Sequence, residues 1–110
     1  MSLKFELTKN EKGEFFFKLA NADGGTLVRS EAYNAKSSAT NGVESVRKNA
    51  AEAGRYELKD ASDGRPYFNL KASNGQVIGT SPMFKDGAAR EAAIAAMKTG
   101  AAGAALDDKS

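Results

Sequence analysis

Few side chains in this 110-residue chain are of the types that usually carry out catalysis. The chain has no histidine, which is the commonest proton carrier near neutral pH and the commonest metal ligand, and it has no cysteine. Carboxylates, lysines and hydroxyls are the reactive groups that remain. We therefore exclude Ser-His-Asp triads, zinc sites and thiol chemistry, and we expect neither a metal nor another cofactor.

Three short motifs resemble known sites without meeting their requirements. Asp60–Gly64 (DASDG) resembles part of a calcium-binding loop but lacks its ligand spacing and its closing glutamate. Ser45–Lys48 reads S-x-x-K and Lys98–Gly100 reads K-T-G, as in penicillin-interacting serine enzymes, yet both fall late in predicted helices. We interpret the first as a hairpin turn and the other two as coincidences, and we expect no enzymatic activity.

The charge balance gives no support to nucleic-acid binding and does not exclude it. Sixteen Lys and Arg residues and fourteen Asp and Glu residues give a net charge of +2, and the two signs are interleaved along most of the chain. Binding to a phosphate backbone needs basic residues gathered on one face. The opening residues lack the apolar region of a signal peptide, and no apolar run is long enough to cross a bilayer. We expect a cytoplasmic protein with no membrane partner.

The sequence consists of two similar repeats, so each predicted strand and helix occurs twice. FELTKNEKGEFFFKL begins at Phe5, YELKDASDGRPYFNL begins at Tyr56, and the two align without insertion. A unit of about fifty residues is near the lower limit for folding alone, so both units should share one core. We predict a single domain over residues 1–110, with repeat one at about 4–54, repeat two at about 55–105, and a disordered tail at 106–110.

Each repeat predicts three strands followed by a helix. Phe15, Phe17 and Leu19 alternate with polar neighbours, which indicates a strand with one buried face, and glycine-containing turns separate the apolar runs. After the third strand the apolar residues follow helical spacing, with Ser37 and Asp86 as predicted N-caps. Gly42 inside the first helix predicts a close approach between helix and sheet. The fold class is α+β, with two tandem β-β-β-α units.

The segments FELTKNEKGEFFFKLANADGG, YELKDASDGRPYFNLKASNGQVIGTS and NGVESVRKNA closely resemble the YegP-like small bacterial proteins of the DUF1508 (UPF0339) family. The resemblance covers nearly the whole chain. It implies one antiparallel sheet with two helices on one face, a pseudo-twofold relation, and a terminal strand exchanged between the units. It implies no activity, because the function of the family is unknown. The second helix departs from the pattern, so a role for Asn41 or Asn49 would exist in one unit only.

The side of the sheet without helices is the one surface with functional content. If Phe15 and Phe17 face the helices, Phe16 must point away from them, and Tyr67 must do the same in the second repeat. An exposed aromatic ring can anchor a partner protein or stack on a nucleobase. The alternative is that these rings only pair across the sheet. The candidate binding residues are Phe16, Lys18, Arg65, Tyr67 and Asn69, with Glu6, Glu14 and Glu57 around them.

Three functions remain open at this stage. The first is a non-enzymatic binding module that uses the helix-free face, with an unidentified protein partner. The second is single-stranded nucleic-acid binding on the same face, which predicts a steep dependence on salt. The third is a small enzyme without a recognisable site. The replacement of a homodimer by two covalently linked units favours a monomer.

Overall fold

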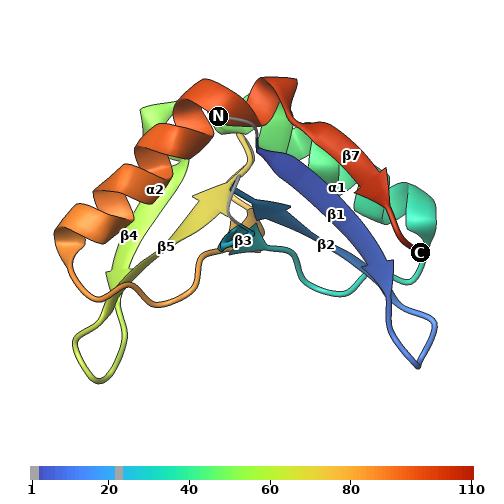
Figure 1. Cartoon of the computed structure of the whole chain (residues 1–110), viewed down its shortest axis with the longest axis horizontal. Coiled ribbons are helices and arrows are strands. Elements are labelled where there is room, and N and C mark those ends of the chain that lie inside the picture. The colour runs from blue at the N-terminus through green and yellow to red at the C-terminus, as the bar shows by residue number, and fades with distance from the viewer. Residues whose placement is uncertain (1–2, 22–23) are drawn as a thin grey trace.

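The computed structural model describes residues 3–21 and 24–110 and shows one sheet with two helices on one side (Figure 1). In the first repeat, three strands precede a helix: β1 (Lys4–Lys9), β2 (Phe15–Ala20), β3 (Thr26–Arg29) and α1 (Lys36–Asn49). A short 3-10 turn, η1 (Ala53–Arg55), leads into the second repeat. There the order recurs as β4 (Tyr56–Asp60), β5 (Pro66–Lys71), β6 (Val77–Thr80) and α2 (Gly87–Gly100), followed by η2 (Ala101–Gly103) and β7 (Ala105–Asp108).

The strand order is β4-β5-β6-β3-β2-β1-β7. The two three-stranded units meet where β3 pairs with β6, at Arg29 and Thr80, so both repeats contribute to one continuous sheet. The predicted antiparallel pairing is confirmed for the first six strands. The sheet is nevertheless mixed, because β7 runs parallel to β1. The expected strand exchange is present, since β7 follows the second repeat and pairs with the first.

The predicted disordered tail is wrong for residues 106–108, which belong to β7. The outer edge of β1 supplies backbone partners, and the Lys109 N–H donates to the Leu7 carbonyl at 2.8 Å. Two lysines hold the acidic side chains of the strand: Lys4 Nζ lies 3.6 Å from Asp107 Oδ2, and Lys36 Nζ lies 2.5 Å from Asp108 Oδ2. The sequence showed an acidic, alanine-rich end but not the basic residues that meet it.

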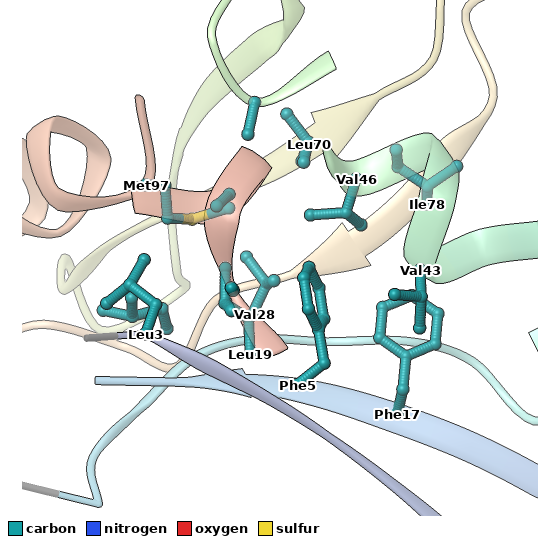
Figure 2. Close-up of a cluster of buried hydrophobic side chains, with 14 of the residues drawn as sticks. Leu3, Phe5, Phe17, Leu19, Val28, Val43, Val46, Leu70, Ile78 and Met97 are labelled. Atoms are coloured by element: carbon teal, nitrogen blue, oxygen red, sulfur yellow. The ribbon is translucent and has the colours of Figure 1, made fainter. Parts of the chain in front are cut away.

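The core lies between the sheet and the helices (Figure 2). The two repeats build it in the same way: Phe5 meets Phe17 edge-to-face, and Tyr56 meets Phe68 edge-to-face. Phe17 and its counterpart Phe68 are fully buried, and each stacks on a further ring, that of Tyr33 or Phe84. The largest fully buried side chains are Phe5, Phe17, Phe68, Leu7, Leu19, Leu70, Met97, Val28, Val43 and Val46.

Local signals in the sequence are mostly confirmed. Gly13 and Gly64 have φ values of 81° and 88° in the two hairpin turns, a conformation that glycine adopts without strain. Asp86 caps α2 by accepting a hydrogen bond from the Ala89 N–H at 2.9 Å. The prediction for Ser37 is wrong: α1 begins at Lys36, and its N-cap, Ala35, makes no side-chain hydrogen bond. Among the residues that the structure describes, no helix has the length and apolar character needed to cross a membrane.

Candidate functional site

We call the side of the sheet opposite the helices the open face. Because side chains alternate along a strand, the residues next to the buried Phe17, Leu19 and Phe68 point to this side. The strand register brings one residue from each strand into a continuous line, the cross-strand row. In strand order the row is Glu57, Asn69, Thr80, Arg29, Lys18, Glu6 and Asp107.

The two ends of the cross-strand row are acidic, and lysines neutralise part of that charge. Glu57 Oε2 lies 3.0 Å from Lys71 Nζ, and Asn69 donates a further hydrogen bond to Glu57 at 3.3 Å. The hydrogen bond from Lys71, followed by that from Asn69, lowers the pKa of Glu57. At the other end, Glu6 Oε1 lies 3.8 Å from Lys18 Nζ and 3.5 Å from Lys109 Nζ. Each of these two acids therefore has at least one lysine partner on the surface of the sheet.

Arg29 occupies the centre of the row, where the two repeats meet. Its side chain is exposed, with Lys18 and Thr80 as cross-strand neighbours. Thr80 donates its hydroxyl to Asn69 Oδ1 at 2.8 Å. The Arg29 guanidinium makes no hydrogen bond or ion pair with any residue that the structure describes. The centre of the open face therefore presents a positive charge that no described acid neutralises.

Two hollows adjoin at Arg29. One has a volume of about 320 Å³ and the other of about 520 Å³, and Arg29 and Ser30 line both. The smaller hollow is completed by Thr26, Glu31, Thr80, Ser81 and Pro82. The larger one is completed by Glu6, Thr8, Phe16, Lys18 and Ala32. An anionic group at Arg29 would therefore have a hollow on either side, and the half-buried ring of Phe16 would line the larger one.

The structure separates the residues that the sequence grouped together. Phe16 and Lys18 line the larger hollow beside Arg29. Tyr67 and Asn69 lie on β5, and in the strand order β6 and β3 separate β5 from β2. Three strand spacings correspond to about 14 Å, so Phe16 and Tyr67 belong to different parts of the open face.

Arg65 lies outside both hollows, immediately before β5. Its Nε donates to Asp63 Oδ2 at 2.7 Å, so this exposed cation already has an acidic partner. Tyr67 is half-buried, and its cross-strand neighbour on the open face is Lys59. Glu14 interacts locally, accepting from the Asn10 side chain at 3.0 Å.

Sequence reasoning missed Arg29, although the sequence carried a usable signal. Alternation along the second strand of each repeat indicates Phe16 and Tyr67, whereas Arg29 lies on the third strand, after the apolar run TLV. The corresponding residue of the second repeat is Thr80. The difference between a charged Arg29 and a neutral Thr80 at equivalent positions is the signal in the sequence that sets Arg29 apart.

The motifs that formally matched enzymes lie where the sequence placed them. Ser45 and Lys48 are in the last turns of α1, and Lys98–Gly100 ends α2. Ser45 accepts hydrogen bonds from the Asn49 side chain through both its carbonyl and its hydroxyl. The described residues contain no group of three or more carboxylates arranged to hold a metal ion. The open face carries cations, acids, hydroxyls and the two aromatic rings of Phe16 and Tyr67.

These features define a class: a small tandem-repeat α+β protein whose two β-β-β-α units share one sheet. The chain belongs to the family described as a domain of unknown function (DUF1508), whose model matches it twice, over residues 10–57 and 61–108. It is 44% identical over 110 residues to the UPF0339 protein PA0329 of Pseudomonas aeruginosa, covering 100% of both chains.

Two solved structures have the same fold. The solution NMR structure of UPF0339 protein SO3888 from Shewanella oneidensis matches with a TM-score of 0.92 at 40% identity, covering 98% of this chain and 92% of that one. The solution NMR structure of yegP from Escherichia coli, described as a protein of unknown function, matches with a TM-score of 0.91 at 42% identity, covering 99% and 94%. The relatives therefore establish the fold and the family.

Proposed function

We propose that this protein is a non-enzymatic binding module that takes a short acidic segment of a partner protein on its open face, with Arg29 as the central anchor. The observation that carries the proposal is the exposed Arg29 guanidinium, which lines both hollows and has no described acidic partner. A charge-assisted hydrogen bond to a carboxylate is the strongest single contact that this surface could offer. Lys18 next to Arg29 adds a second cation, and Phe16 adds an apolar contact.

The charge pattern favours a short acidic group over a long polyanion. A chain of phosphates that followed the cross-strand row would meet Glu57 at one end and Glu6 with Asp107 at the other. Like charges brought together at an interface reduce affinity. A segment with one or two carboxylates needs only Arg29 and the adjoining Lys18, so it meets fewer acids than a chain that follows the whole row. We expect the module to act in the cytoplasm, a location that fractionation of cells would check.

The test is an NMR titration of the isotope-labelled full chain with a capped peptide that carries two carboxylates, Ser-Glu-Phe-Glu-Ser. We expect chemical-shift changes at the amides of Phe16, Lys18, Arg29 and Thr80. Arg29→Thr introduces the residue that the second repeat has at this position, so it should fold, and it should weaken binding about tenfold or more because a charged hydrogen bond is lost.

Arg65→Thr is the matched control, since it removes the same charge from an exposed residue outside both hollows. It should bind the peptide as the unchanged chain does. If both variants weakened peptide binding equally, the loss would follow from the lower net charge alone, which would contradict an anchor at Arg29. A peptide with glutamine in place of glutamate should give no shifts, and equal shifts with both peptides would also oppose the proposal.

Single-stranded nucleic-acid binding is a second candidate, and one observation favours it. Tyr67 on the open face has Lys59 across the strand pair and Arg65 two residues before it, so an aromatic ring lies among cations. A titration with a mixed-sequence single-stranded eight-nucleotide DNA would then shift the amides of residues 65–69, and the shifts would fade with added salt. Tyr67→Ala should remove this response without affecting peptide binding at Arg29.

A further inference from the structure

The two repeats differ in how the outer edge of their first strand is covered. β7 pairs along the outer edge of β1, and Leu7 on that strand is fully buried. β4 is the corresponding strand of the second repeat and lies at the end of the strand order, where β5 is its one neighbour among the strands that the structure describes. Leu58, the counterpart of Leu7, is 50% exposed. Of these two equivalent strands, β1 has a covered outer edge and β4 has an open one.

The chain connectivity explains this difference. The segment that follows the second repeat is free to pair with β1, and it does so as β7. The segment that follows the first repeat becomes β4 itself, after η1. In the described parts of the chain, no segment therefore pairs with the outer edge of β4 as β7 pairs with β1. An open edge presents unpaired backbone groups and is a template for a further strand.

The outward backbone groups of β4 can be identified from the hydrogen bonds. Asn10 N–H donates to the Glu14 carbonyl in the first hairpin, and Ala61 N–H donates to the Arg65 carbonyl in the second. Equivalent residues of the two hairpins therefore direct their backbone groups to the same side of the strand. In the first hairpin the Leu7 carbonyl faces outward and accepts from Lys109 N–H. Hydrogen-bonding direction alternates along an antiparallel strand. Tyr56, Leu58 and Asp60 therefore direct their backbone groups to the open edge.

The sequence of β4, Tyr-Glu-Leu-Lys-Asp, is complementary to itself in an antiparallel arrangement. When Leu58 lies opposite Leu58 of a second chain, Glu57 lies opposite Lys59 on the open face, twice by symmetry. A shift of the register in one direction places Glu57 opposite Glu57, and a shift in the other direction places Lys59 opposite Lys59. Opposite charges stabilise directly paired positions and like charges destabilise them.

We propose that the open edge of β4 binds a second copy of this chain, forming a closed dimer in which two β4 strands pair antiparallel with Leu58 at the twofold axis. The pairing uses the outward groups of Tyr56, Leu58 and Asp60, brings the two exposed Leu58 side chains together, and joins the two seven-stranded sheets. Arg90 leaves these groups free: it donates to the Lys59 carbonyl, which faces β5, at 3.1 Å and lies 3.7 Å from the Asp60 carboxylate.

A β7 strand from another copy fits this edge less well. On β1, the acidic Asp108 of β7 is held by Lys36, but the counterpart of Lys36 in the second repeat is Gly87. Such a strand would also bring its carboxylates to an edge that already carries Glu57 and Asp60. Pairing β4 with β7 of the next copy would give an open chain of molecules, whereas pairing β4 with β4 closes after two.

The contact is small, so the dimer should be weak and visible only at high protein concentration. We would measure molar mass by sedimentation equilibrium on the full chain up to about 1 mM, where a weak complex is populated. Amide hydrogen exchange at low and high concentration would be recorded in parallel. We expect the mass to rise from monomer to dimer and to stop there, with added protection at Tyr56, Leu58 and Asp60.

Two variants test the register. Lys59→Glu places two pairs of like charges across the interface and should weaken dimerisation at least tenfold, whereas the double variant Glu57→Lys with Lys59→Glu restores unlike pairs and should recover most of it. Lys85→Glu, on an exposed residue outside β4, is the control for net charge and should leave dimerisation unchanged. The heteronuclear spectrum of each variant checks that it is folded.

Three results would overturn the proposal. The first is a monomer over the whole concentration range with no change in exchange at the β4 amides. The second is a mass that grows past the dimer, which would indicate β4 pairing with β7 in an open chain. The third is a dimer that Lys59→Glu leaves intact, which would place the interface elsewhere. Association weakened by Lys59→Glu and restored by the double variant would establish the pairing.

Discussion

The ring of Phe17 lies directly against Gly42. A Cβ atom placed on Gly42 would stand 2.7 Å from Cε2 of Phe17 and 2.9 Å from the hydroxyl oxygen of Tyr33. Both rings are part of the packing that joins α1 to the sheet. The close helix-to-sheet approach that the sequence predicted at Gly42 is therefore present, and it explains why a residue unfavourable to helices occurs in the middle of α1.

Gly42→Ala should destabilise the protein by about 1–2 kcal/mol. Overpacking a core costs about 1–3 kcal/mol, and the gain in helix propensity returns up to about 1 kcal/mol. Urea unfolding followed by circular dichroism measures the change. Gly54→Ala is the control, because no atom lies within 4 Å of a Cβ built there. An increase in stability for Gly42→Ala would mean that the two rings move aside without cost.

Ser30→Ala and Ser81→Ala should each cost about 1–3 kcal/mol, since each leaves a buried backbone N–H without its partner. The Ser30 hydroxyl accepts from the Phe17 N–H at 2.9 Å and donates to the Glu31 carbonyl at 2.8 Å. Ser81 makes the equivalent bonds to Phe68 and Pro82 in the second repeat. Ser38→Ala, on an exposed residue, should change the free energy of unfolding by less than about 0.5 kcal/mol. Equal effects from Ser30 and Ser38 would contradict a specific role for the buried hydroxyl.

Arg47→Ala should destabilise the protein by about 1–3 kcal/mol and loosen β7 in particular. The guanidinium donates to the Ala104 carbonyl at 2.7 Å and lies 5.3 Å from the centre of the Phe5 ring, so it joins α1 both to the segment entering β7 and to β1. Its counterpart in the second repeat is the exposed Lys98, and Lys98→Ala should have little effect. Hydrogen exchange at β7 would separate a local from a global change. A similar loss for both variants would indicate a contribution of helix charge alone.

The sequence predicted the parts of the fold that repeat. Three local signals occur in both repeats: the alternation along Phe15–Leu19, the turn glycines, and the helical spacing after the third strand. Because each signal occurs twice, a chance match to strands, turns and a helix is improbable. The parallel pairing of β7 could not be predicted from the residues, because its ion pairs join residues that lie far apart in the sequence: Lys4 with Asp107, Lys36 with Asp108, and Lys109 with Glu6. The family resemblance, and not the strand pattern, implied the exchange.

The candidate site was predicted only in part, because local patterns in the sequence do not show which strands are neighbours. Alternation correctly placed Phe16 and Lys18 on the open face, but it carries no information about which strands are neighbours. Only the strand order shows that Phe16 and Tyr67 are far apart and that Arg29 is central. The difference between Arg29 and Thr80 is visible in the sequence, but the place of Arg29 at the junction of the two repeats is set by the register between β3 and β6.

The attachment of β7 should depend on pH through Asp108. A hydrogen bond from Lys36, followed by hydrogen bonds from Ser110, lowers the pKa of the Asp108 carboxyl from its ordinary 3.8 to about 2. Because the pKa is lower in the folded protein than in the unfolded chain, the contribution of the carboxylate is complete above about pH 4 and is lost as the pH falls towards 2. We therefore expect the amide of Lys109, which donates to Leu7, to lose protection across this window.

The pKa itself can be read from the carboxyl carbon shift of Asp108 in an NMR titration. Lys36→Ala removes the largest cause of the shift, so the pKa should rise towards 3.8, and protection of the Lys109 amide should be lost at a correspondingly higher pH. Lys85→Ala removes the same charge from an exposed loop residue and should leave the titration of Asp108 unchanged. If Asp108 titrated near 3.8 in the unchanged chain, its bond with Lys36 would not persist in solution, and β7 would be held by its backbone pairing with β1 alone.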